Sequence, residues 1–255
     1  MTLARTEITV GSGDAARTIA ILERSGKAPG VVFLGGFMSD MHGTKAEALD
    51  AFAAETGRAI TRFDYSGHGE SSGAFADGTI SRWLEEAAAV LDRAAGAPLV
   101  VVGSSMGGWI ALLLALAEAQ SGRTRIAGLV LLAPAVDMTH SLILPHMSAE
   151  ARAEMETTGA WRLPSAYSGT PYVITKALIE DGARHLLGEK PIAIRAPVHI
   201  IQGVLDEEVP WGHAVDLVSH LAEDDVVLTL VKDAGHRLSR PEDLAKIISA
   251  VAAIV

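Results

Sequence analysis

The sequence contains no cysteine, few aromatic residues and no excess of positive charge. The absence of cysteine from all 255 residues excludes disulfide bonds and thiolate metal sites. Acidic side chains outnumber basic ones and give a formal net charge of -10, which disfavours binding to nucleic acids or anionic membranes. Because 49% of the residues are hydrophobic, we expect one folded α/β domain with a buried core, not a disordered chain.

The first residues lack the features of a secretory signal. Residues 1–10 contain no basic patch followed by an apolar run, so we expect no signal peptide and a cytoplasmic location. Residues 94–117 carry no charged side chain and are numerous enough for a membrane span. A glycine-rich turn at 103–108 divides this stretch into a β-branched half and a half rich in Ala and Leu. This division indicates a buried strand followed by a helix, and no membrane span.

The turn between that strand and that helix has a recognisable spacing. It reads Gly103-Ser104-Ser105-Met106-Gly107 and matches the Gly-x-Ser-x-Gly pattern of a nucleophile elbow. A serine on so sharp a turn has a strained backbone, and the flanking glycines avoid collisions with the strand and the helix. The spacing predicts Ser105 as the nucleophile and the Met106 amide as an oxyanion donor. Ser104 occupies the variable position, so its side chain is expected to point elsewhere. A packing turn without chemistry is the alternative.

Strands and helices alternate along most of the chain. Expected strands are 7–10, 17–23, 31–34, 59–63, 99–102, 126–132, 197–201 and 226–231, the first two forming an antiparallel pair. Expected helices are 44–56, 80–94, 110–117, 148–157, 175–187, 211–221 and 241–254. This alternation predicts an α/β fold in which helices cover both faces of a mainly parallel central sheet.

The alternation is interrupted between residues 135 and 191. This stretch follows the strand after the elbow helix, so we expect it to lie over the carboxyl edge of the sheet. We predict a helical lid at 135–191 that lines a pocket, inserted into a core formed by residues 1–134 and 192–255.

A glycine pair follows the strand at 31–34. Glycine lets bare backbone approach a substrate, so this loop is suited to the second half of an oxyanion hole. The Phe37 amide is the expected donor, and Met38 is the alternative. An ordinary loop between a strand and a helix is the competing interpretation.

Two histidines are candidates for the base that activates Ser105. His68 precedes the serine, whereas the order along the chain in this architecture is serine, acid, histidine. We therefore interpret His68 and Asp64 as residues that brace their loop. His236 follows the last expected strand at the catalytic edge of the sheet and is the predicted general base.

The acid that would orient His236 follows a late strand. Asp206 comes after a glycine turn beyond the strand at 197–201 and is the favoured carboxylate, with Glu207 and Glu208 as rivals. No cofactor is expected. A metal site is disfavoured because His213 and His220 share one predicted helix without a third ligand.

These residues together resemble the α/β-hydrolase superfamily, and more narrowly its subgroup of mitochondrial depalmitoylating thioesterases, also described as acyl-glucuronide esterases. The matching segments are 37–46, 62–67, 103–109, 161 with 164–168, and 206 with 209–211. The resemblance implies a serine hydrolase of carboxylic esters or thioesters, with a small-molecule or acylated-protein substrate. The resemblance also implies that Ser105, Asp206 and His236 form the catalytic triad and that the amides of Phe37 and Met106 are the oxyanion donors. The targeting segment of mitochondrial members is not expected in this chain.

Other functions are compatible with the same pattern. Carbon–carbon bond hydrolases and cofactor-free haloperoxidases also use a serine triad, so they stay open as alternatives. Dehalogenases and epoxide hydrolases need an aspartate in place of Ser105. A non-catalytic ligand-binding protein is the alternative from another class. The sequence does not indicate an oligomeric state.

Overall fold

The computed structural model describes residues 2–94, 98–163, 171–188, 190–221 and 225–255. Segment 164–168, which contributed to the resemblance, lies outside the described residues. A central sheet of eight strands has the order β1-β2-β4-β3-β5-β6-β9-β10. Their bounds are β1 Leu3–Val10, β2 Arg17–Arg24, β3 Lys27–Leu34, β4 Arg58–Phe63, β5 Leu99–Ser104, β6 Ile126–Leu132, β9 Val198–Gly203 and β10 Val226–Val231.

The sheet is parallel except at one end. β1 pairs with β2, and β2 with β4, in antiparallel register, whereas every pair from β4 to β10 is parallel. The expected antiparallel pair near the N-terminus and the mainly parallel sheet are therefore confirmed. β3 begins at Lys27, earlier than expected, and its register with β4 is irregular between Lys27 and Val31.

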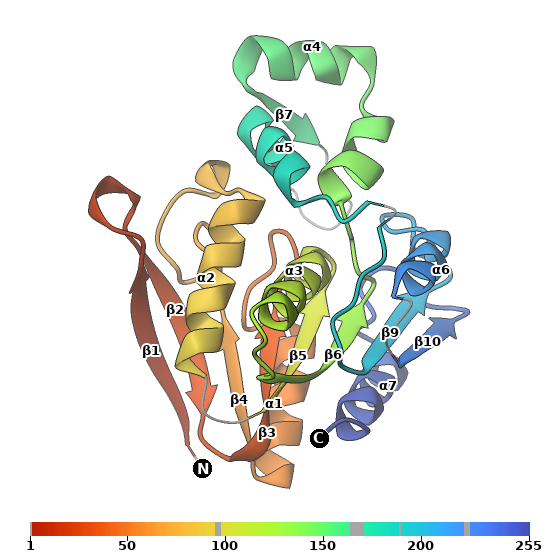
Figure 1. Cartoon of the computed structure of the whole chain (residues 1–255). Coiled ribbons are helices and arrows are strands. Elements are labelled where there is room, and N and C mark those ends of the chain that lie inside the picture. Colours follow the sequence, from red (N-terminus) through yellow and green to blue (C-terminus); the bar gives the residue numbers. More distant parts are fainter. Residues whose placement is uncertain (1, 95–97, 164–170, 189, 222–224) are drawn as a thin grey trace.

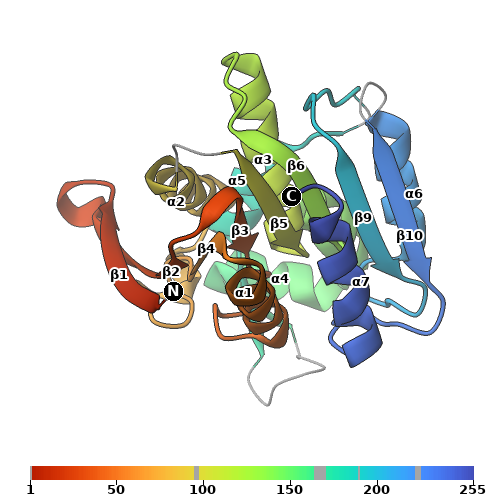
Figure 2. The same cartoon turned by 90° about the horizontal axis from the view of Figure 1, so that it is seen from below.

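Helices cover both faces of the sheet (Figures 1 and 2). One face carries α2 (Ile80–Arg93), α3 (Met106–Gln120) and α6 (Trp211–His220), and the other carries α1 (Thr44–Thr56) and α7 (Pro241–Ala252). Trp83 of α2 and Trp109 of α3 are completely buried in the first core. Every residue of β5 is buried, as expected for a strand covered on both faces. Within the described residues, no helix is long and apolar enough to cross a membrane.

A small unit is inserted between β6 and β9. It contains a π-helical turn (Thr139–Ile143), α4 (Ala149–Thr158), an antiparallel ribbon of β7 (Ala160–Leu163) and β8 (Tyr172–Thr175), and α5 (Lys176–Gly182). The two expected helices of the insertion are present, and the ribbon is an addition that the sequence analysis did not predict. Trp161 and Leu163 pair with Ile174 and Tyr172, which are residue types that favour strands. α5 ends at Gly182, well before the expected position 187.

The inserted unit lies beyond one edge of the sheet (Figure 1). The parallel strands all end at that edge, so the loops after β3, β4, β5, β9 and β10 meet there. These five loops carry the residues that the sequence analysis selected. The topology therefore brings together side chains that are far apart in the sequence.

Candidate active site

The turn from β5 to α3 holds Ser105 in an unusual backbone conformation. Its φ and ψ angles are 54° and -118°, in a region that residues other than glycine rarely adopt. Neighbouring backbone leaves no space for side chains beside it: a Cβ atom on Gly107 would lie 2.2 Å from the carbonyl oxygen of Leu34. The strain, typically about 1–3 kcal/mol for such a residue, is borne by a packed strand and helix on either side.

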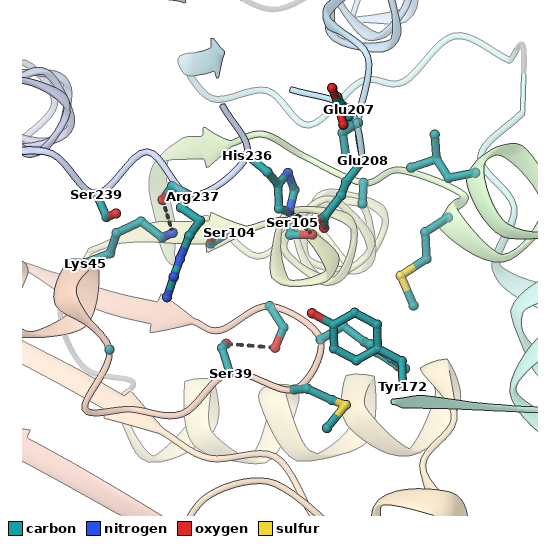
Figure 3. A pocket seen from close by; sticks show the side chains of 18 of the residues that line it. Ser39, Lys45, Ser104, Ser105, Tyr172, Glu207, Glu208, His236, Arg237 and Ser239 are labelled. Carbon is teal, nitrogen blue, oxygen red and sulfur yellow. Dashed lines mark hydrogen bonds and ion pairs between the residues drawn. The ribbon is translucent and has the colours of Figure 1, made fainter. Parts of the chain in front are cut away.

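Three side chains from separate loops form one chain of hydrogen bonds (Figure 3). Nε2 of His236 lies 3.1 Å from Oγ of Ser105, and Nδ1 lies 2.8 Å from Oδ2 of Asp206. A carboxylate only accepts hydrogen bonds, so Nδ1 carries the proton and Nε2 is left to accept from the Ser105 hydroxyl. The arrangement can move a proton from the serine to the imidazole.

Asp206 is the carboxylate that faces Nδ1. Its side chain is fully buried, and the backbone amides of Glu208 and Val209 each donate a hydrogen bond of 2.9 Å to Oδ1. The rival Glu208 reaches the opposite ring nitrogen, with Oε2 at 3.5 Å from Nε2 of His236. Glu207 lines the adjoining cavity. Of the three carboxylates considered, only Asp206 is therefore placed to orient the imidazole.

Gln202 is a member of this network that the sequence analysis missed. It is buried near the end of β9, and its Nε2 donates to Oδ2 of Asp206 at 3.0 Å and to the Val209 carbonyl at 2.9 Å. The available signal was a polar residue at the end of a largely apolar strand. Such a residue holds the Asp206 carboxylate from behind and limits its rotation.

The candidate oxyanion donors differ in whether their backbone amides already have a hydrogen-bond partner. The amide of Met38 donates to Nε2 of His68 at 3.1 Å, so it is already engaged. The Phe37 amide has no hydrogen-bond partner among the described residues. Met106 begins α3, where amides lack partners within the helix. A Cβ atom on Gly36 would lie 3.3 Å from the Cβ of Ser105, which shows how closely this loop approaches the serine.

His68 and Asp64 brace their own loop, as interpreted from the sequence, and also contact the loop after β3. Burial lowers the pKa of His68 to about 4, so its ring is neutral near pH 7 and Nδ1 donates to the Ser66 carbonyl at 3.2 Å. Nε2 then accepts from Met38. The carboxylate of Asp64 accepts from the Met41 amide at 2.7 Å and from the Glu70 amide at 2.8 Å.

Ser105 opens into a cavity of about 610 Å³. One wall is apolar and comes mostly from the inserted unit; it consists of Phe37, Met138, Leu142, Ile143, Leu163, Tyr172 and Ile174. The opposite wall is polar and includes Ser39, Lys45, Arg237 and Ser239 (Figure 3). The cavity can therefore hold an apolar chain on one side of the serine and a polar group on the other.

The chain is similar to known hydrolases over most of its length. A family model described as serine aminopeptidase, S33 matches residues 27–176. The mitochondrial palmitoyl-protein thioesterase ABHD10 of mouse is 34% identical over 236 residues, which cover 91% of this chain and 77% of that protein. Its solved structure has a TM-score of 0.85 at 31% identity and 97% coverage of both chains. A crystal structure of a putative hydrolase from Agrobacterium vitis has a TM-score of 0.97 at 48% identity and full coverage of both chains.

Proposed function

The chain belongs to this serine aminopeptidase family of the α/β-hydrolase superfamily and is a hydrolase, and from this premise we propose that Ser105, His236 and Asp206 are its catalytic triad. The observation that carries the proposal is the unbroken chain of hydrogen bonds from the strained serine to a buried carboxylate. The bonds cleaved are carboxylic esters or thioesters, through an acyl-enzyme intermediate.

The geometry suits acyl transfer in two steps. Ser105 attacks the substrate carbonyl while His236 takes its proton, and the imidazolium then gives that proton to the leaving alcohol or thiol. Asp206 keeps Nδ1 protonated and stabilises the charged ring. Water repeats the attack on the acyl-enzyme and releases the acid. The amides of Phe37 and Met106 stabilise the oxyanion, and each donor of this kind contributes about 3 kcal/mol.

For the substrate, we propose a thioester with a long apolar acyl group, as on an S-acylated protein. The curated relatives are named palmitoyl-protein thioesterases, which supports this class. The apolar wall from the inserted unit gives an acyl chain a surface to bury. We further propose that residues 135–191 act as a lid over the core formed by 1–134 and 192–255, because several of its side chains line the cavity.

A cytoplasmic location stays our prediction from the sequence. The curated relatives are named mitochondrial, which describes those proteins. Fractionation of cells that produce the tagged full chain distinguishes the two compartments.

Replacing the nucleophile tests the proposed function. The variant Ser105→Ala is expected to lose turnover of p-nitrophenyl esters and of a palmitoyl thioester by at least about 10³-fold, because no other group can form the acyl-enzyme. Ser104→Ala is the matched control, since it removes a hydroxyl one residue away. Retained turnover in the Ser105 variant would show that the nucleophile lies elsewhere.

A further inference from the structure

Lys45 connects two segments that are distant in sequence. It is the second residue of α1, and its Nζ donates a hydrogen bond of 2.6 Å to the backbone carbonyl of Arg237. Figure 3 shows this contact at the polar wall of the cavity. Arg237 directly follows His236, so the ammonium group holds the chain next to the imidazole.

The loop between β10 and α7 is also fastened elsewhere. Before His236, the Leu205 amide donates to the Ala234 carbonyl at 2.9 Å. At the base of the loop, the Arg240 guanidinium pairs with the Asp233 carboxylate at 3.0 Å. The segment immediately after the imidazole has a further contact from the opposite side of the cavity, where α1 begins. Lys45 supplies that contact.

Placing an ammonium group there is unfavourable in itself. Burial, together with the nearby Arg237 guanidinium, lowers the pKa of Lys45 to about 8, although the Asp243 carboxylate opposes this. The hydrogen bond to the Arg237 carbonyl and the Asp243 carboxylate together offset this cost.

We propose that Lys45 is a positioning residue for His236: by fixing the Arg237 carbonyl it keeps the imidazole directed at Ser105. This inference rests on the proposed function, because it requires His236 to be the base. Both acylation and deacylation need the imidazole in place, so loss of the contact lowers kcat whichever step is slower.

Steady-state kinetics with neutral substrates test this role. In Lys45→Met, which keeps the aliphatic stem and removes the donor, kcat for p-nitrophenyl acetate and butyrate is expected to fall on the order of ten-fold. KM should change by less than about two-fold, since neither ester carries a charge for the ammonium group to bind. Lys45→Arg, which keeps donors, should restore kcat to within about three-fold of the native value. Lys232→Met is the matched control, because it removes an exposed lysine from the same loop.

Two results would overturn the proposal. One is that Lys45→Met has the native kcat while Ser105→Ala is inactive. This result would exclude the role of Lys45 and leave the proposed function intact. The other is a raised KM with unchanged kcat, which would show that Lys45 contacts the substrate. An active Ser105→Ala would instead overturn the proposed function itself. If circular dichroism shows that Lys45→Met does not fold, Lys45→Gln takes its place with the same expected and opposing results, because its amide is too short to reach the carbonyl.

Discussion

His68 is buried among aromatic rings next to the loop after β3, with the rings of Phe75 and Trp83 centred 5.1 and 5.3 Å from its own. Its contacts require a neutral ring, because Nε2 accepts a hydrogen bond from the Met38 amide. Protonation would remove that acceptor and place a charge in an apolar site. The ionisation of His68 therefore links the conformation of the loop after β3 to pH.

This link predicts how stability depends on pH. The folded-state pKa of His68 is about 4, below the ordinary value of 6.5, so the unfolded chain binds a proton over this range and the folded chain does not. Stability from this residue is complete above pH 6.5 and decreases as the pH falls toward 4. In urea unfolding, the free energy of unfolding of the native protein should decrease between pH 6.5 and pH 4 by up to about 3 kcal/mol more than that of His68→Gln. Parallel curves for the two proteins would contradict the assignment.

At the scale of single residues, the sequence analysis selected the residues that a motif spacing or the order along the chain identifies. The elbow spacing selected Ser105, and the order along the chain separated His236 from His68. Gln202 and Lys45 were not selected, because each acts through a contact that only the folded chain creates. Lys45 and Arg237 are 192 positions apart, and no local pattern joins them.

The strand, turn and helix around Ser105 form the element on which the site depends. Gly107 lies against the carbonyl oxygens of Leu34 and Gly35, at 2.2 and 2.5 Å from where a Cβ atom would be. Any side chain there must push α3 away from β3 and move the serine with it. This contact explains why the spacing of the elbow is strict.

Two glycine substitutions compare this element with an ordinary helix. Gly107→Ala should lower the free energy of unfolding by at least about 2 kcal/mol and reduce kcat, because backbone atoms must move. Gly212→Ala is the control: it lies in α6 with no atom within 4 Å of the added methyl group, so it should be neutral or stabilising by up to about 1 kcal/mol. Both values come from chemical denaturation. Equal stability of the two variants would contradict the close packing at the elbow.

The same scale shows where prediction from sequence is weakest. The central sheet could be predicted from the sequence because strands and helices alternate along the chain. Each strand is apolar on the one or two faces that it buries. The ribbon of the inserted unit could not be predicted in this way, because it is defined by pairing between Trp161 and Ile174 and by packing against the small core of that unit. Short apolar segments of this kind are ambiguous between helix and strand until their neighbours are known.

For the whole molecule, the cavity is assembled from two parts with different roles. Loops at the carboxyl edge of the sheet carry the serine, the imidazole and the polar wall, whereas the inserted unit supplies most of the apolar wall. In the proposed function, the chemistry and the selectivity for the acyl group therefore come from separate stretches of the chain. Charges of both signs line this cavity, since Asp40, Glu207 and Glu208 lie in its lining together with Lys45 and Arg237.

Mapping a covalent adduct tests the central assignment most directly. The native protein is incubated with a fluorophosphonate, and its intact mass and its peptides are measured. The account predicts one added group, located on Oγ of Ser105, and none on the neighbouring Ser104. An adduct on any other residue, or undiminished labelling of Ser105→Ala, would contradict it.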